Sequence, residues 1–255
     1  MNIIVPIKQV PDLVEELEVD ESGKDLNREW LKYKINEFDD HALEEALQLK
    51  EEVGGQVTVV ALDSEGIDKT LFTAAAKGAD KLVKVTGDFG AGVASHVAAQ
   101  ALAGVIKGME YDLVLTGVQA ADDRDGQIAV LLAHYLGLPH VSVVTGVRID
   151  NNKAIVHKEY SGGIMGEFEV DLPAVLGVQA ARETPRYAPV SRVRQAMRQT
   201  SLDEVAAGQA EVPVGSSVQR IFKPETGAGA EMLEGAPEEI VDKILNILKE
   251  KGIKA

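Results

Sequence analysis

The segment TGVQAADDRDGQ, residues 116–127, combines glycines with three aspartates where a strand pattern gives way to a helix pattern. A glycine-bearing turn that opens a helix can bind phosphate, because free backbone N–H groups and the helix dipole both favour an anion. The three aspartates against Arg124 leave the segment with a charge of −2, which disfavours a triphosphate without a metal. The segment therefore predicts a site for a monophosphate or a neutral-bodied nucleotide. The alternative is that the aspartates only cap the helix and face water.

Two other polar segments follow apolar runs in the same way. Lys8–Gln9 comes after the first run, and Leu62–Asp63–Ser64 comes after the second. In an open parallel sheet, ligands bind beyond the carboxyl ends of the strands. We therefore expect these segments and residues 116–127 to lie at one edge of a sheet.

Several other chemistries have no support in the sequence. Cysteine is absent, which excludes disulfides and thiolate chemistry, and the five histidines form no pair at metal-ligand spacing. There is no G-x-S-x-G elbow, no G-x-x-x-x-G-K-[ST] loop and no G-x-G-x-x-G after the first strand. The first strand leads into KQVPD, where an ATP-cleaving enzyme of this topology would carry a serine- and glycine-rich loop. We expect no catalytic residue and no metal site.

Strand and helix patterns alternate through the first half of the chain, which is typical of βαβ units and a parallel sheet. The low aromatic content, 4%, suits strands built from Val, Ile, Leu and Ala. After Pro139 the runs VSVVTGVRID, KAIVHKEY and GEFEVDL predict hairpins with turns at NN and SGG, and PAVLGV predicts one more buried strand. The predicted strands of the first half are 2–8, 56–62, 81–85 and 111–117, and the predicted helices are 36–55, 66–80, 92–108 and 126–137.

The patterns predict an α/β fold: a doubly wound, mainly parallel sheet with a β-hairpin extension, over residues 1–180. Residues 181–215 are predicted to form a protruding arm and linker. Residues 216–255 end in a helix, APEEIVDKILNILKEKG, whose first position is Pro237 and whose apolar face must pack on this domain or on a partner.

The predicted arm is basic in an otherwise acidic chain. Arg182, Arg186, Arg192, Arg194 and Arg198 lie close together, and prolines on both sides of the RYA sequence favour a stiff, exposed segment. Such an arm is more typical of partner docking than of catalysis. The alternative is an ordinary helix with a charged face.

The overall charge limits the partners. With 26 Lys and Arg against 41 Asp and Glu, the formal net charge is −15, which argues against nucleic-acid binding and against binding to anionic membranes. No apolar run approaches the ~20 residues that span a bilayer. The N-terminus lacks the pattern of a signal peptide, so we expect a cytoplasmic protein without membrane insertion.

Several segments, in order, resemble the beta subunits of electron-transfer flavoproteins, over about residues 1–200. Those segments are VPIKQVPD, INEFDDHALEEALQLKE, AAAKGADK, DLVLTGVQAADD, the GQ that opens the next helix, LPAVLGV and ETPRYAPVSRVRQAM. The resemblance implies a heterodimer with an alpha subunit that holds most of an FAD. It also implies electron transfer between flavin dehydrogenases, such as acyl-CoA dehydrogenases, and a quinone oxidoreductase or another acceptor. The protein would then be an electron carrier without substrate chemistry of its own.

The resemblance also implies a Rossmann-like adenine-nucleotide site in this chain. Val190 would be the docking anchor, with Arg186 and Tyr187 in the supporting loop and Arg192 and Arg194 in the following helix. The nucleotide pocket would use Pro6, Asn36, Glu37, Phe38, Asp39, Leu62, Gly117, Val118, Gln119, Ala120, Ala121, Asp122, Asp123, Arg124, Asp125, Gly126 and Gln127.

The nature of the bound nucleotide stays open. The loop between Gln119 and Gly126 is shorter than in the family and net negative, which favours AMP or an empty pocket over an FAD with its pyrophosphate. KQVPD is common among electron-bifurcating relatives, in which a second FAD occupies the same place and NADH is oxidised. A third alternative is a stand-alone adenine-nucleotide sensor of the same topology.

Overall fold

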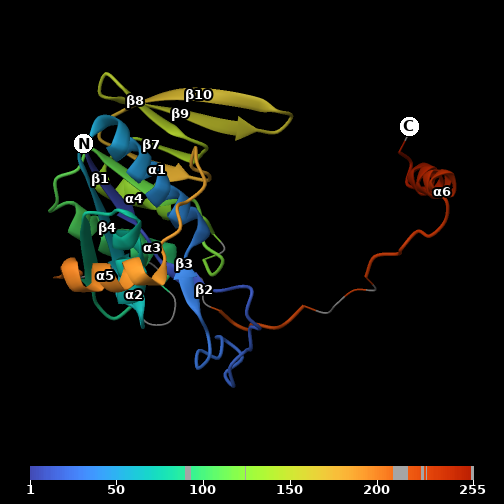
Figure 1. Ribbon diagram of the computed structural model, residues 1–255, viewed down its shortest axis with the longest axis horizontal. Coiled ribbons are helices and arrows are strands. Elements are labelled where there is room, and N and C mark those ends of the chain that lie inside the picture. Colours follow the sequence, from blue (N-terminus) through green and yellow to red (C-terminus); the bar gives the residue numbers. More distant parts are fainter. Residues whose placement is uncertain (90–92, 124, 209–217, 225–226, 228, 254–255) are drawn as a thin grey trace. The chain divides into compact units, whose positions relative to one another are not determined.

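A sheet of seven parallel strands forms the centre of the computed structural model of the chain (Figure 1). Every pairing within this sheet is parallel. The inner strands are rich in Val, Ile and Leu and are buried, as expected for a parallel sheet that is covered on both faces. In spatial order the strands are β12 (Leu202–Ala206), β5 (Lys81–Thr86), β4 (Gln56–Leu62), β1 (Asn2–Pro6), β6 (Leu113–Gly117), β11 (Ala174–Val178) and β7 (His140–Val144).

The structure describes residues 1–89, 93–123, 125–208, 218–224, 227 and 229–253. The chain divides into two compact units, Met1–Gln219 and Arg220–Ala255. The first unit holds every strand and the first five helices, and the second holds the last helix. Among the described residues, no helix combines the length and the apolar character needed to cross a membrane.

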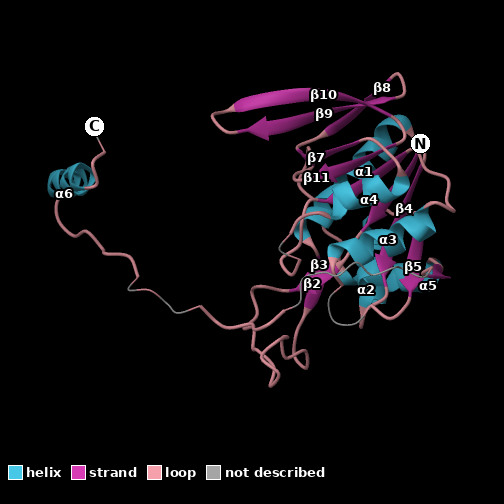
Figure 2. Ribbon diagram, turned by 180° about the vertical axis from the view of Figure 1, so that it is seen from behind, coloured by secondary structure: helices cyan, strands magenta, loops and turns pink. Residues whose placement is uncertain are grey.

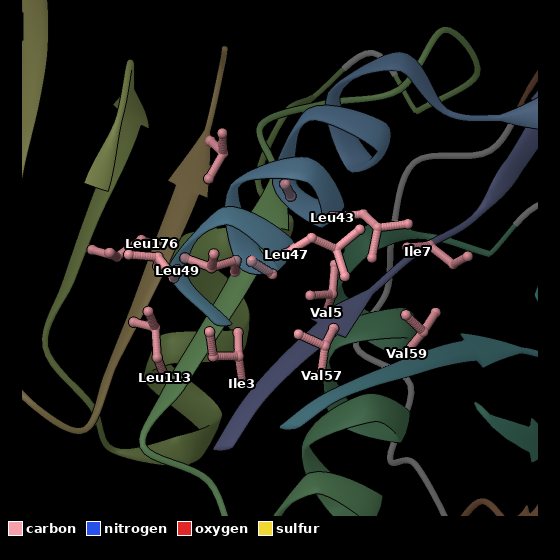
Figure 3. Packing of buried hydrophobic residues seen from close by; sticks show 14 of the residues in the cluster. Ile3, Val5, Ile7, Leu43, Leu47, Leu49, Val57, Val59, Leu113 and Leu176 are labelled. Atoms are coloured by element: carbon pink, nitrogen blue, oxygen red, sulfur yellow. The ribbon is translucent and has the colours of Figure 1, made fainter. Parts of the chain in front are cut away.

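Helices cover both faces of the sheet (Figure 2). On one face, α1 (Glu37–Val53) and α2 (Ile67–Lys77) pack on a core that includes Ile3 and Val5 of β1. Figure 3 shows Leu43, Leu47 and Leu49 of α1 in this core.

The opposite face carries the other pair of helices. There, α3 (Ser95–Ile106) and α4 (Ile128–Leu136) pack with Ile4 of β1 and Val60 of β4. Neighbouring residues of β1 thus face opposite layers, which is the period of a strand. The predicted doubly wound α/β fold is confirmed.

The order of the strands creates one switch point. From β1 the chain passes through α1, β4 and α2 to β5 on one side, and α3 then returns it to β6 on the other side of β1. Connections diverge above and below the sheet between β1 and β6, so ligands in such folds bind beyond the carboxyl ends of these two strands. Residues 118–127 directly follow β6 and therefore lie at this point.

A second sheet carries the predicted hairpin extension. It consists of β8 (Val147–Asp150), β9 (Lys153–Tyr160) and β10 (Ile164–Asp171), all antiparallel. Asn151 and Asn152 have φ values of 45° and 64°, as a tight hairpin turn requires, so the turn predicted at NN is confirmed. Residues 141–150 were expected to form one strand, but they divide at Gly146 (φ 129°) between the central sheet and the hairpin sheet.

The N-terminal loop closes with a short ladder. β2 (Gln9–Pro11) pairs with β3 (Tyr33–Ile35), and between them an isolated bridge joins Val19 to Leu26. The sequence predicts a long loop or a small hairpin at 15–32, and the structure combines both. This ladder carries the chain from the end of β1 to the start of α1.

The predicted arm supplies two elements to the first unit. α5 (Val190–Gln199) packs against α2, and β12 pairs with β5 as the edge strand of the central sheet. Sequence reasoning misses β12 because LDEVA carries two acidic residues and only a short apolar pattern. Lys84 of β5 forms an ion pair with one of these two acids, Glu204, at 2.8 Å from its Nζ. The same Nζ lies 3.0 Å from Asp68 of α2. The described part of the arm thus lies against the domain rather than standing away from it.

The second unit contains the predicted C-terminal helix, α6 (Pro237–Glu250). Pro237 opens it, and Glu239 accepts a hydrogen bond from the N–H of Ala236 at 3.2 Å. Apolar Ile240, Ile244 and Leu248 recur at helical spacing, and no residue of α6 is buried among the residues that the structure describes. What α6 packs on stays a prediction. The linker residues 209–217 lie outside the described residues.

Candidate functional site

Asp39 joins the three elements that meet at the switch point. It lies in the first turn of α1, and its side chain is almost fully buried (6% exposed). Its Oδ2 accepts a hydrogen bond from the N–H of Lys8 at 2.9 Å, and its Oδ1 accepts one from the N–H of Gly117 at 3.2 Å. One carboxylate therefore holds α1 to the carboxyl ends of β1 and β6.

Burial raises the pKa of Asp39 to about 7. The hydrogen bonds from the Lys8 N–H, the Asn36 side chain and the Gly117 N–H, together with the charge of Lys8, oppose this rise but do not cancel it. The carboxyl group therefore changes charge near neutral pH at the centre of the candidate site.

Gly117 is required by this contact rather than by a turn. A Cβ added there would collide with Asp39 Oδ1 and with the backbone of Phe38 and Asp39. Sequence reasoning places Gly117 in a phosphate-binding turn, whereas the structure shows it as the last residue of β6, pressed against α1.

The loop at 118–127 is fastened to its surroundings at three points. Asn36 Nδ2 donates to the carbonyl oxygen of Gln119 at 2.8 Å. Lys8 Nζ lies 2.6 Å from Asp122 Oδ1. Ser95 Oγ at the start of α3 donates to Asp125 Oδ1 at 2.7 Å.

Two of these contacts depart from the sequence analysis. Asn36 does occupy the N-cap position of α1, but its side chain makes no capping bond within the described residues and reaches Gln119 instead. Sequence reasoning misses Ser95 as a site residue. A serine that opens a predicted helix is a weak signal, because it is ordinarily an N-cap.

Asp123 offers an unused acceptor. Its Oδ2 accepts a hydrogen bond from the Ala120 N–H at 2.9 Å, whereas its Oδ1 is buried and has no hydrogen-bond partner among the described residues. Burial raises the pKa of Asp123, as do the neighbouring charges of Asp125 and Asp122. A buried acceptor without a partner among the described residues is suited to receive a hydrogen bond from a ligand hydroxyl or amine.

The start of α4 offers unused donors. Gln127 is its N-cap residue, and within the described residues its side chain makes no capping hydrogen bond. Gly126 adopts a left-handed φ of 59°, which brings the chain into the helix. The first N–H groups of a helix without a side-chain cap are available to an anion. These N–H donors and the cation of Lys8 fit a phosphate, and the Asp123 oxygen is an acceptor that fits a hydroxyl group of a nucleotide.

The other predicted pocket residues lie around the same centre. Pro6 ends β1, Leu62 ends the neighbouring strand β4, and Glu37 and Phe38 begin α1. Within the loop, Ala120 is buried, Val118 is half-buried and Ala121 is exposed. Arg124 lies outside the described residues. Among the described residues, no group of three or more His, Asp and Glu side chains is arranged to hold a metal ion.

A separate open depression lies at the ends of β4 and β5 and against α5. Its lining includes Asp63, Ser64, Phe89 and Met197. Its lining does not include the residues around Asp39, but the two regions adjoin. Gln9 Nε2, next to Lys8, donates to Ser64 Oγ at 3.4 Å and to the carbonyl oxygen of Glu65 at 2.7 Å. The expected meeting of Lys8–Gln9 with Asp63–Ser64 at one edge of the sheet is confirmed.

The predicted docking residues divide into two groups. Tyr187 and Val190 are 81% and 61% exposed, and Arg192 and Arg194 are exposed on α5. Arg186 instead turns back to α1 and binds Glu44 and Glu51. The structure therefore does not bring Arg186 to the surface formed by the others.

The fold and the site define a doubly wound α/β domain with a glycine-bearing, acidic loop at its switch point. A model of the electron transfer flavoprotein domain matches residues 25–211. The chain belongs to the family of electron transfer flavoprotein beta subunits.

Three relatives illustrate the similarity. The electron transfer flavoprotein subunit beta of Methylophilus methylotrophus is 35% identical over 98% of each chain, and that of Bacillus subtilis (strain 168) is 30% identical over 99% of each. The caffeyl-CoA reductase-Etf complex subunit CarD of Acetobacterium woodii is 32% identical over 99% of this chain and 100% of its own. The family gives the chain an electron-transfer role that involves flavin, and its beta subunits imply an alpha-subunit partner.

A pair of glycine variants tests the contact at Gly117. We expect Gly117→Ala to lower the free energy of unfolding by about 2 kcal/mol or more, because the methyl group displaces Asp39. Gly104→Ala in α3 is the matched control: that position is open, so alanine should stabilise the helix by roughly 0.5–1 kcal/mol. Urea unfolding measures both. Equal stability of the two variants would contradict the close packing at Gly117.

The pKa of Asp39 predicts how stability depends on pH. In the unfolded chain Asp39 has its ordinary pKa of 3.8, whereas in the folded protein it keeps its proton up to about pH 7. Its contribution to stability is therefore greatest at low pH. From about pH 5 to about pH 7 the free energy of unfolding should fall by at most about 1.4 kcal/mol per pH unit, and then level off.

The Asp39→Asn variant isolates this effect, because it lacks the titrating group. Urea unfolding at several pH values should show that the difference between wild type and variant shrinks or reverses as pH rises. A constant difference across this range would show that Asp39 does not titrate there.

Proposed function

We propose that this chain is the beta subunit of a heterodimeric electron carrier and holds a structural AMP at the switch point. The observation that supports this most is the set of polar groups around Asp39: the N–H groups at the start of α4, the cation of Lys8, and Asp123 Oδ1, an acceptor without a partner among the residues that the structure describes. These groups suit one phosphate and a hydroxyl-bearing ribose. The acids of the loop disfavour further phosphates.

The roles of the residues follow from their contacts. Asp39 fixes the ends of β1 and β6, and Asn36 fixes the loop through Gln119. Lys8 is paired with Asp122 and can bind a phosphate in its place. When bound by the complex, FAD supplies the redox chemistry, and it is held mainly by the alpha subunit. No residue of this chain is assigned a catalytic step, so the protein is a carrier rather than an enzyme.

The proposed docking surface supports the choice of the remaining partners. Tyr187 and Val190 expose an aromatic and an aliphatic side chain next to Arg192 and Arg194. Such a surface suits flavin dehydrogenases, such as acyl-CoA dehydrogenases, as electron donors, with a quinone oxidoreductase as an acceptor. We place this activity, including a part in fatty acid oxidation, in the cytoplasm.

A second candidate is the electron-bifurcating form. It is favoured by the similarity to a subunit named for a caffeyl-CoA reductase–Etf complex and by the Lys8–Asp12 segment. In that case a second FAD would occupy the switch point and the complex would oxidise NADH.

The nucleotide content of the complex distinguishes these candidates. The chain is purified with its alpha partner, the complex is denatured, and released FAD and AMP are quantified. We expect one FAD and one AMP per heterodimer. Two FADs without AMP would replace the proposal with the bifurcating form, and a chain that is a stable monomer and binds ATP with magnesium would overturn both.

Matched variants connect this result to the site. Asp123→Asn replaces the carboxylate by an amide, so an NH2 donor can take the place of the Oδ1 acceptor. A ligand hydroxyl that donates to Oδ1 would lose its acceptor, and the AMP content should fall at least several-fold. Asp150→Asn, on the exposed hairpin, should leave the content unchanged. Equal AMP content in both variants would remove Asp123 from the site.

Docking is tested through Val190. Val190→Ala should slow electron transfer from the dehydrogenase by about tenfold, because the variant loses an exposed aliphatic anchor. The flavin absorption spectrum should not change, because Val190 is exposed and the FAD is proposed to be held mainly by the alpha subunit. Stopped-flow reduction of the heterodimer measures the rate. Unchanged kinetics in an intact complex would contradict the assignment of Val190.

A further inference from the structure

Two arginines of the predicted arm are bound to four glutamates of α1, and we call this group the arginine clasp. The two arginines are four positions apart, and each contacts two glutamates that are seven positions, or about two turns, apart on one helix face. The clasp consists of Arg182, Arg186, Glu44, Glu45, Glu51 and Glu52.

Arg186 is held by both its backbone and its side chain. Its N–H and its Nε both donate to Glu44 Oε2 at 2.9 Å, and its NH2 donates to Glu44 Oε1 at 2.9 Å. Its NH1 donates to Glu51 Oε1 at 2.8 Å. The side chain of Glu44 is only 5% exposed, so it is accessible to Arg186 but not to another protein.

Arg182 repeats the arrangement with the glutamates that lie one position further along α1. Its N–H donates to Glu45 Oε2 at 3.0 Å, its Nε to Glu45 Oε1 at 2.8 Å and its NH1 to Glu52 Oε1 at 2.7 Å. Glu45 is fully buried and also accepts the N–H of Val147 at 2.8 Å. Buried carboxylates satisfied by several donors in this way fix the backbone of the segment that supplies them.

The clasp lies directly before the docking surface. Tyr187 follows Arg186, and Val190 begins α5 three residues later. Both side chains are largely exposed, so packing around them does little to fix their position. A segment that is already ordered loses less entropy on docking than a mobile one.

We propose that Arg186 is a positioning residue: it holds Tyr187 and Val190 in the orientation that a partner recognises, through Glu44 and Glu51, and does not itself contact the partner. This rests on the proposed function. It differs from a docking role of the Arg186 charge, because the charge is already paired within the chain.

Two variants separate the two roles. Arg186→Lys keeps the charge but cannot reproduce the planar fork that reaches Glu44 and Glu51 together. Glu44→Gln alters only a buried group that no partner can reach. The control is Arg148→Lys, in an exposed pair with Asp150 on β8 (3.6 Å).

Each variant is purified as the heterodimer, and its reduction by an acyl-CoA dehydrogenase of the same organism is followed. We expect both clasp variants to raise the KM for the heterodimer by about tenfold and to leave kcat and the flavin spectrum unchanged, since preorganisation acts on binding. Hydrogen exchange of the amides in residues 182–190 should become faster in both. Arg148→Lys should match the wild type in every measurement.

The remaining outcomes each overturn one claim. Unchanged exchange in both variants would show that the clasp does not order the arm. Faster exchange with an unchanged KM would show that this order does not serve docking. A raised KM in Arg186→Lys but not in Glu44→Gln would make Arg186 a direct contact. A wild-type heterodimer that no flavin dehydrogenase reduces would overturn the proposed function, and the exchange measurement would still test the clasp.

Discussion

The buried carboxylate of Asp39 is the constraint on which the rest of the site depends. It accepts backbone N–H groups from the ends of β1 and β6, the two strands on either side of the switch point. Those strand ends are also the start of the Lys8 segment and of the acidic loop, so their spacing sets the distance between Lys8 and the acidic loop. Gly117 is the steric counterpart of this contact, because only a residue without a side chain allows α1 to come so close. Burying a charged carboxylate costs free energy, because the charge loses its hydration. This cost raises the pKa of Asp39 to about 7.

The same helix also holds the segment before α5. The first turn of α1 organises the candidate nucleotide site, and its later turns supply the glutamates that bind Arg182 and Arg186. Its apolar face meanwhile packs on β1 and β4. One rigid element therefore sets the positions of both the nucleotide loop and the docking segment relative to the sheet. In the electron carrier proposed here, this would keep the two sites in a constant relation within this subunit.

Sequence reasoning recovers the repeating layers well because periodicity and glycine stops are local signals, as at Gly78 after α2 and Gly137 after α4. It locates the loop at 118–127 for the same reason. It fails where long-range partners decide the outcome. Asn36 has the sequence context of a helix cap, but its amide binds a residue that follows β6. Arg186 belongs to an apparently exposed basic arm, but its partners lie about 140 positions earlier in α1. The edge strand β12 depends on β5 for its pairing, and its own short sequence does not indicate a strand.

The docking segment is fastened at both of its ends, by the clasp before α5 and by β12 after it. The outward face of α5 can then change its side chains without changing how the domain folds, since the inward residue Ala196 and the two fastenings carry the stability. In the carrier proposed here, partner preference and folding stability would therefore depend on different residues. Substitutions on one helix face would then let the proposed carrier acquire new electron donors over evolutionary time while the candidate nucleotide site stays intact.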